Sequence, residues 1–229
     1  MPTVLLGDYL TAPDDGMLDG TPYRQMTETG LAGFLAHWEE WHQQALTLLT
    51  HRVHPTARIH PSAIIGDDVI IGPHVRVWEF STVRAGSVLC SGVSVGFNCE
   101  VTRSFLCERA VLGHRIGINH TLVGAGAHLS ANLTVAAISM WNPLMSAPEK
   151  EITLRVPEGL YRCGTPRFGA LIGDRVQTGN SISLGPGLAL GRGCRIGSGV
   201  TLAARSVPGN SVITAPHTSE VHVRGRRRP

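Results

Sequence analysis

An aliphatic residue recurs at every sixth position over much of the chain, and this period constrains the fold more than any other feature. The first run consists of Val53, Ile59, Ile65, Ile71, Val77, Val83, Leu89, Val95 and Val101. The residue four positions after each of them is small or apolar in nearly every hexad. This period differs from that of a helix, and it predicts a solenoid in which each hexad supplies a short strand and a corner. Three hexads, roughly eighteen residues, would close one triangular coil with the aliphatic residues stacked inside.

The period continues in a changed register through the middle of the chain and returns near its end. It shortens by one residue at Leu106 and again at Val123, and a second run extends from Ile172 to Leu202. We therefore expect one solenoid over residues 51–215, with a loop insertion at about 137–167 where the period is broken. A loop this long is uncommon in a compact protein, so we expect a functional lid or contact, with a passive insertion as the alternative.

The segments on either side of the solenoid differ from it. Within residues 1–50, an irregular stretch precedes apolar residues at helical spacing, which predict an amphipathic helix. These apolar positions are Leu31, Phe34, Leu35, Trp38, Trp41, His42, Ala45, Leu46 and Leu49. We expect this helix to cap the open end of the solenoid, covering an edge that would otherwise aggregate. Residues 216–229 contain four arginines and predict a solvated basic tail, with a clamp on ligand phosphates as the alternative.

Composition excludes several classes of protein. The 229 residues include 27 glycines and only 5% aromatic residues, which suits tight corners and small interior side chains. The net charge of +3 comes without a basic, aromatic-rich surface, so we expect no nucleic-acid partner. Five cysteines without a CxxC pair predict neither a disulfide framework nor a zinc site. With no signal peptide and no stretch of membrane-spanning length, the sequence predicts a cytoplasmic protein without a membrane partner.

Polar residues that interrupt the aliphatic pattern are the candidates for chemistry. His114 lies in VLGHRIGINH, beside the irregular register. Because histidine titrates near neutral pH, it could remove a proton from an amine or a hydroxyl group that attacks a thioester carbonyl. In the predicted coil, Arg84 and Thr102 stack directly, and Asn119 is next in that column. The candidates for binding an acyl acceptor are Arg84, Thr102, Arg103, Asn119, His128 and Arg167.

Two stretches resemble a known family. STVRAG…VGFNCEVTRSFLCERAVLGH and RFGALIGDRVQTGNSISLGPG resemble the acetyltransferase domain of the bifunctional N-acetylglucosamine-1-phosphate uridyltransferases and their stand-alone relatives, which are hexapeptide-repeat acyltransferases. The resemblance extends over residues 53–212. It implies an all-β fold, a left-handed parallel β-helix, assembled as a homotrimer. It also implies transfer of an acyl group from acetyl-CoA, or another acyl-CoA as co-substrate, to a small polar acceptor such as an amino sugar. No bound cofactor or metal is implied, and without the nucleotidyltransferase domain we expect no uridylyl transfer.

The resemblance also implies roles for individual residues. His114 falls on the general base, and Arg84 and Arg167 fall on residues that contact the phosphate of the acceptor. Asn180 and Ser198 fall on positions that line the coenzyme A groove.

Three positions depart from the family pattern and leave the acceptor open. Thr102 replaces a lysine, although Arg103 is adjacent; Gly117 replaces a tyrosine, and His128 replaces an asparagine.

Two other functions fit a solenoid of this kind. One is a non-catalytic scaffold or regulatory protein, which coenzyme A binding would distinguish from an enzyme. The other is a metal-dependent carbonic anhydrase of hexapeptide type, because His114 is followed by His120. Zinc requires three convergent imidazoles, and the spacing of six differs from that of those enzymes by one residue.

Overall fold

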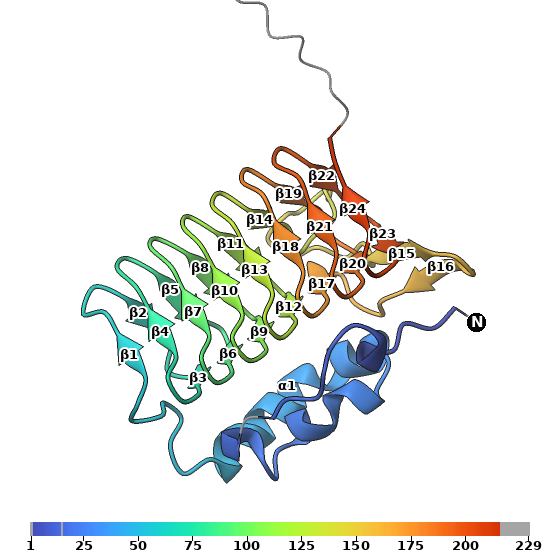
Figure 1. The fold of residues 1–229 in the computed structure, drawn as a ribbon. Coiled ribbons are helices and arrows are strands. Elements are labelled where there is room, and N and C mark those ends of the chain that lie inside the picture. Colours follow the sequence, from blue (N-terminus) through green and yellow to red (C-terminus); the bar gives the residue numbers. More distant parts are fainter. Residues whose placement is uncertain (1, 15, 216–229) are drawn as a thin grey trace, which may run out of the picture.

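The structure, a computed structural model, describes residues 2–14 and 16–215, and its main body is a coil of short parallel strands (Figure 1). Sheet 1 contains β1 (Arg58–Ile59), β4 (Arg76–Val77), β7 (Ser94–Val95), β10 (Val111–Leu112), β13 (His128–Leu129), β18 (Gln177–Thr178), β21 (Arg195–Ile196) and β24 (Val212–Ile213). Sheet 2 contains β2 (Ile64–Ile65), β5 (Thr82–Arg84), β8 (Glu100–Thr102), β11 (Gly117–Asn119), β14 (Thr134–Val135), β19 (Ser183–Leu184) and β22 (Thr201–Leu202). Sheet 3 contains β3 (Ile70–Ile71), β6 (Val88–Leu89), β9 (Phe105–Leu106), β12 (Leu122–Val123), β17 (Ala170–Ile172), β20 (Leu188–Leu190), β23 (Arg205–Val207), β15 (Thr153–Val156) and β16 (Gly159–Arg162).

The coil runs from sheet 1 to sheet 2 to sheet 3 and back, so each turn has three corners. We call the corner between sheets 1 and 2 the first corner and the corner between sheets 2 and 3 the second corner. The aliphatic residues of the six-residue period point inward, and most of them are buried in one continuous core. Burying such a side chain stabilises the fold by roughly 1.5–3 kcal/mol. The predicted all-β fold, a parallel β-helix of hexapeptide repeats, is confirmed.

The strand pairing confirms the two shortened hexads. Val77 pairs with Ile59, and Leu106 pairs with Leu89. The sequence separation of the second pair is one residue shorter than that of the first. Val123 then pairs with Leu106 at the same shorter spacing. A third shortened coil, in which Val207 pairs with Leu190, was not predicted.

The N-terminal residues form a second layer beside the coil. This layer contains three 3₁₀ helices, Leu6–Asp8, Gly16–Leu18 and Pro22–Glu28, and the α-helix α1, Leu31–Leu48. The predicted helix is therefore present, but the prediction that it caps the open end of the solenoid needs correction. Figure 1 shows α1 alongside the coil, below the strands of sheet 3.

The physical reason for this position lies in sheet 3, whose strands are apolar on both faces. Their outward-facing side chains are buried against the N-terminal layer in a second core; they include Ile70, Val88, Phe105, Leu122 and Leu171. Strands that are covered on both sides read as continuous apolar runs. Tyr23 contacts Phe105 with ring centroids 5.0 Å apart, and its hydroxyl is 2.9 Å from Nδ1 of the buried His42. The helix thus covers the side of the coil formed by sheet 3, because the outward-facing side chains there are apolar.

The loop insertion adds a hairpin to this arrangement. Its strands β15 and β16 pair in antiparallel fashion, and β15 pairs with β23, which extends sheet 3. The Tyr161 hydroxyl accepts a hydrogen bond of 2.8 Å from the backbone N–H of Ala32, so the hairpin also contacts the N-terminal layer. The earlier part of the insertion exposes large apolar side chains, namely Met140, Trp141, Leu144 and Met145.

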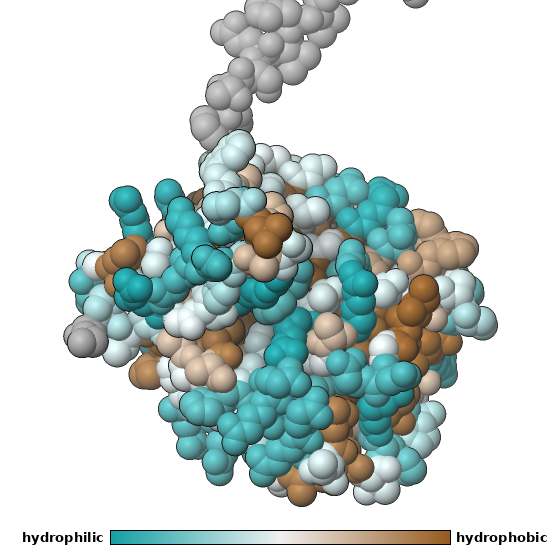
Figure 2. Space-filling view, turned by 180° about the vertical axis from the view of Figure 1, so that it is seen from behind, coloured by the Kyte–Doolittle hydropathy of each residue, from teal (hydrophilic) through white to brown (hydrophobic). Residues whose placement is uncertain are grey.

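None of the helices formed by the described residues combines the length and the apolar character needed for a membrane crossing. The face seen from behind in Figure 2 is a mosaic of hydrophilic and apolar patches. The predicted basic tail, residues 216–229, lies outside the described residues.

Candidate active site

A groove of about 530 Å³ lies along the first corner and contains His114. Strand β10 ends at Leu112, and the following residues turn the chain toward β11, so the exposed His114 side chain stands at the corner. His128 and Asn180 line the same groove. Three residues that were predicted from different coils thus meet in one place.

Backbone hydrogen bonds stack the corners into a column. The carbonyl of Phe97 accepts a bond from the coil that contains His114, and the carbonyl of His114 accepts one from the next coil. Asn180 is further along, and its backbone N–H donates to Oγ of Ser198 at 2.9 Å. His114, Asn180 and Ser198 therefore follow one another along the coil axis, where an extended ligand could contact all three.

Two aromatic residues in this groove were missed by the sequence analysis. Trp78 and Phe97 line the groove with 45% and 39% of their surfaces exposed, and neither belongs to the two cores. The sequence does mark these two residues, because tryptophan and phenylalanine do not fit the small and aliphatic positions of a hexad. Phe97 also contacts Phe80 edge to face, with ring centroids 5.8 Å apart. The groove lining therefore combines exposed aromatic rings with polar side chains.

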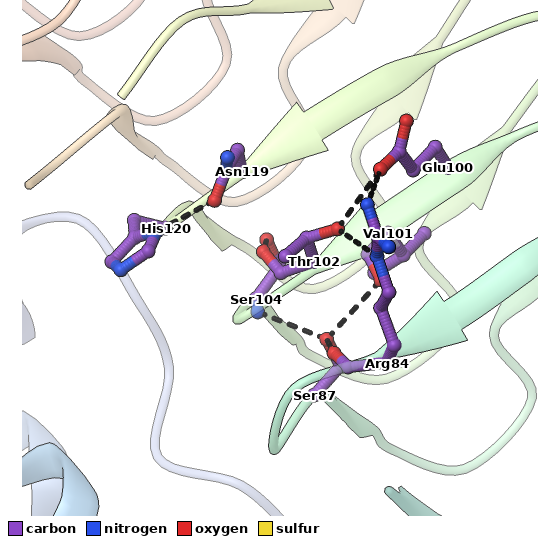
Figure 3. Close-up of polar contacts among 8 residues, drawn as sticks. All are labelled: Arg84, Ser87, Glu100, Val101, Thr102, Ser104, Asn119 and His120. Atoms are coloured by element: carbon purple, nitrogen blue, oxygen red, sulfur yellow. Dashed lines mark hydrogen bonds and ion pairs between the residues drawn. The ribbon is translucent and has the colours of Figure 1, made fainter. Parts of the chain in front are cut away.

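A second group of predicted residues lies on the outer face of sheet 2. Arg84, Thr102 and Asn119 are paired in register across β5, β8 and β11, which confirms the predicted column. Figure 3 shows that Arg84 forms an ion pair with Glu100 and donates a bond to the Thr102 hydroxyl, 3.2 Å from its Nε. Glu100 also accepts a bond from Thr102 at 3.3 Å.

The remaining predicted residues surround His120 at the second corner, close to α1. Arg103 forms an ion pair of 2.5 Å with Glu39 of α1, and Arg167 donates a bond of 3.0 Å to the carbonyl of Ser146. His120 donates from Nδ1 to the side-chain oxygen of Asn119 at 2.6 Å (Figure 3). Arg103 thus ties the coil to the N-terminal layer. The predicted acceptor-binding residues divide between this group, the sheet 2 face and the groove.

The pKa of His120 predicts a pH-dependent stability. Burial lowers this pKa from 6.5 to about 4, and the charges of Arg103 and Arg167 add to the effect. Because the folded state favours the neutral imidazole, its contribution is fully present above pH 6.5 and is lost as the pH falls toward 4. Between pH 7.5 and pH 4.5 we expect urea unfolding to show a loss of about 2 kcal/mol that disappears in His120→Gln. The same substitution at the exposed His37 should leave the pH-dependent loss in place; an unchanged loss in His120→Gln would contradict the prediction.

Within residues 2–14 and 16–215, no group of three or more histidine, cysteine, aspartate or glutamate side chains is arranged to hold a metal ion.

Comparisons with known proteins agree with the coil and its expected family. Residues 49–158 match the family model described as the GMPPB C-terminal domain. A putative uncharacterized acetyltransferase of Escherichia coli K12, YaiX, is 26% identical over 96 residues, which cover 42% of this chain and 39% of that protein. The chain therefore matches well under half the length of this curated relative. Together with the fold, these matches confirm the predicted resemblance to hexapeptide-repeat acyltransferases.

Solved structures of similar type were also found. The UDP-N-acetylglucosamine O-acyltransferase of Moraxella catarrhalis is 16% identical, with a TM-score of 0.47, over 72% of this chain and 63% of that one. An N-acyltransferase of Bacillus cereus, in complex with dTDP-4-amino-4,6-dideoxyglucose and coenzyme A, is 16% identical, with a TM-score of 0.40, over 76% and 84% of the two chains.

Proposed function

We propose that the protein is an acyl-CoA-dependent N-acyltransferase, with acetyl-CoA as the first candidate donor and an amino sugar, sugar phosphate or nucleotide-linked sugar as the acceptor. The observation that carries the proposal is the single groove that brings His114 together with His128 and Asn180. The similarity to a putative acetyltransferase supports the same reaction class.

In the proposed reaction, His114 is the general base. Its imidazole accepts a proton as the acceptor amine attacks the thioester carbonyl of the acyl-CoA. The carbon–sulfur bond then breaks, an amide forms, and coenzyme A leaves as the thiol. Exposure of His114 within the groove favours this role, and no hydrogen bond to a described residue occupies its imidazole. Asn180 and Ser198, in the same column, would contact coenzyme A.

The proposal includes the setting in which the protein works. We propose a homotrimer, because the outer faces of sheets 1 and 2 are not covered by the N-terminal layer. We also propose a cytoplasmic location, in keeping with five cysteines that are all buried.

A substrate screen tests the proposal. Amino sugars, their phosphates and their nucleotide derivatives would be incubated with acetyl-CoA and with longer acyl-CoAs, and products would be identified by mass spectrometry. We expect an acceptor whose mass rises by one acyl group, with release of one thiol per product. Absence of both coenzyme A binding and acyl transfer would favour the scaffold alternative instead.

A further inference from the structure

A pocket of about 380 Å³ lies beside the His114 groove on sheet 1, whose first two strands are β1 and β4 (Figure 1). Its charged and aromatic lining consists of Arg58, His60, Arg76 and Trp78, and its other lining residues are apolar. We call it the tryptophan pocket. Trp78 also lines the His114 groove, so the two cavities meet at this ring. No residue of the tryptophan pocket has a role in the proposed reaction.

Two arginines stand side by side in the tryptophan pocket. Arg58 on β1 and Arg76 on β4 are paired in register, and both are exposed. Neighbouring strands lie about 4.8 Å apart, and like charges directly opposite each other destabilise a sheet. Neither side chain forms an ion pair or a hydrogen bond with another described residue, and the pocket lining contains no carboxylate. An anion between the two guanidinium groups would offset both charges, and phosphate matches their planar fork.

Trp78 supplies an aromatic surface next to these charges. It is 45% exposed and belongs to neither core. Its Nε1 donates a hydrogen bond to Oγ of Ser94 at 3.4 Å, which holds one edge of the indole against sheet 1. The base of a nucleotide can stack on such a ring, because every base has a flat π-face. The tryptophan pocket thus combines a surface for a base with a pair of unpartnered cations for phosphate.

We propose that the tryptophan pocket binds a nucleotide, whose base stacks on Trp78 and whose phosphates lie between Arg58 and Arg76. The pocket itself stands apart from the proposed function, because a bound nucleotide requires no acyl transfer. Its use by a substrate rests on that function. Two ligands of the proposed reaction carry a nucleotide, namely a nucleotide-linked amino sugar and coenzyme A.

The position of Trp78 along the coil favours the acceptor as the source of the nucleotide. Strands β4, β7 and β10 are consecutive in sheet 1, so Trp78 lies two coils before His114, about 10 Å along the coil axis. Asn180, a proposed contact of coenzyme A, lies two coils after His114. The tryptophan pocket and the proposed coenzyme A contacts are therefore on opposite sides of His114. We expect the sugar that is attached to the bound nucleotide to lie in the groove.

Isothermal titration calorimetry on the full-length protein tests the pocket with ADP, UDP and inorganic pyrophosphate, which has the phosphates without a base. Both nucleotides should bind more tightly than pyrophosphate. Trp78→Ala should weaken nucleotide binding roughly tenfold to hundredfold and leave pyrophosphate binding within about twofold of the parent. Trp78→Phe, which keeps an aromatic ring, should retain most of the nucleotide affinity. Equal nucleotide affinity in Trp78→Ala and the parent would overturn the proposal.

The arginines have a matched control in the same chain. Arg155 on β15 and Arg205 on β23 are also exposed and paired in register, yet they line neither the tryptophan pocket nor the groove. Arg76→Gln should weaken the binding of both nucleotides and of pyrophosphate roughly tenfold to hundredfold, the usual size of a lost hydrogen bond to a charged group. Arg155→Gln should stay within about twofold of the parent. Equal losses in the two variants would show that any pair of arginines attracts these anions, and the pocket would be refuted.

Two further measurements identify the source of the nucleotide. If the acceptor carries it, Trp78→Ala should raise the KM for a nucleotide-linked amino sugar at least about tenfold. The KM for the free amino sugar and the Kd for coenzyme A should not change. A loss of coenzyme A affinity instead would keep the nucleotide site but assign it to the donor.

Failure of the pocket and failure of the proposed function give different results. Nucleotide binding that depends on Trp78, in a protein that transfers no acyl group, would refute only the proposed function. Acyl transfer together with nucleotide binding that is insensitive to Trp78 would refute only the tryptophan pocket.

Discussion

Replacing His114 with alanine is expected to lower the kcat of acyl transfer about 10²–10⁴-fold, the usual contribution of a general base. The acceptor amine must lose a proton as it becomes an amide nitrogen, and His114 is an exposed imidazole at the corner of the groove. Asn180 and Ser198, the proposed contacts of coenzyme A, lie further along the column and are left intact. Coenzyme A binding should therefore persist. Steady-state kinetics and calorimetry on the same preparation measure both properties.

The control for this variant is another exposed histidine on the coil. His74→Ala removes an exposed imidazole that does not line the groove, and it should retain full activity. His128→Ala is more informative within the groove, because His128 was predicted to bind the acceptor. We expect it to raise KM more than it lowers kcat. Retained turnover in His114→Ala, with normal folding, would remove His114 from the mechanism.

The coil could be predicted because its signal is local and repeated. Each hexad repeats the same pattern of an aliphatic residue and a small or apolar residue. A hexad that is one residue short, as at Leu106 and at Val123, therefore stands out as a break in this pattern. The third shortened coil, at Val207, lies in the last turns of the solenoid. Too few hexads follow it for the change of register to be recognised in the sequence.

The position of the helix could be predicted from the residues that precede the inward-facing aliphatic ones, which the six-residue period does not include. In the strands of sheet 3, the residue before the inward-facing aliphatic is itself apolar, as in Val88 and Phe105. In β1 and β4 of sheet 1 the same position holds Arg58 and Arg76. Every third hexad is thus apolar on both faces, which indicates a covered side rather than a covered end.

The site was predictable in part. The column of Arg84, Thr102 and Asn119 could be predicted because residue spacing along a regular coil translates directly into position. The roles of His114, Asn180 and Ser198 were instead implied by the family resemblance. The role of Arg103 depends on Glu39, a residue of the N-terminal helix, and no repeat pattern predicts contacts between separate layers. Binding of the acceptor by Arg103 stays a prediction, and it requires that Arg103 contact the acceptor while it is paired with Glu39.

Phe105→Ala is expected to cost about 4 kcal/mol of unfolding free energy, within the range for truncating a fully buried phenylalanine. Phe105 is 0% exposed and belongs to the second core, between β9 and the N-terminal layer. Its ring contacts Tyr23, whose hydroxyl bonds to His42 of α1. The truncation therefore leaves a cavity at the point where the coil, the 3₁₀ segment and α1 meet. Urea unfolding followed by circular dichroism measures the loss.

Phe80→Ala is the matched control, since Phe80 is 62% exposed at the first corner and should change the unfolding free energy by less than about 0.5 kcal/mol. Tryptophan fluorescence adds a second observable, because Trp38 is buried in the same layer as Tyr23. If the layer is held to the coil mainly by the apolar face of sheet 3, the fluorescence change in Phe105→Ala should begin at lower urea than the loss of strand signal. Coincident transitions with a loss below about 1 kcal/mol would show that this contact does not hold the two layers together.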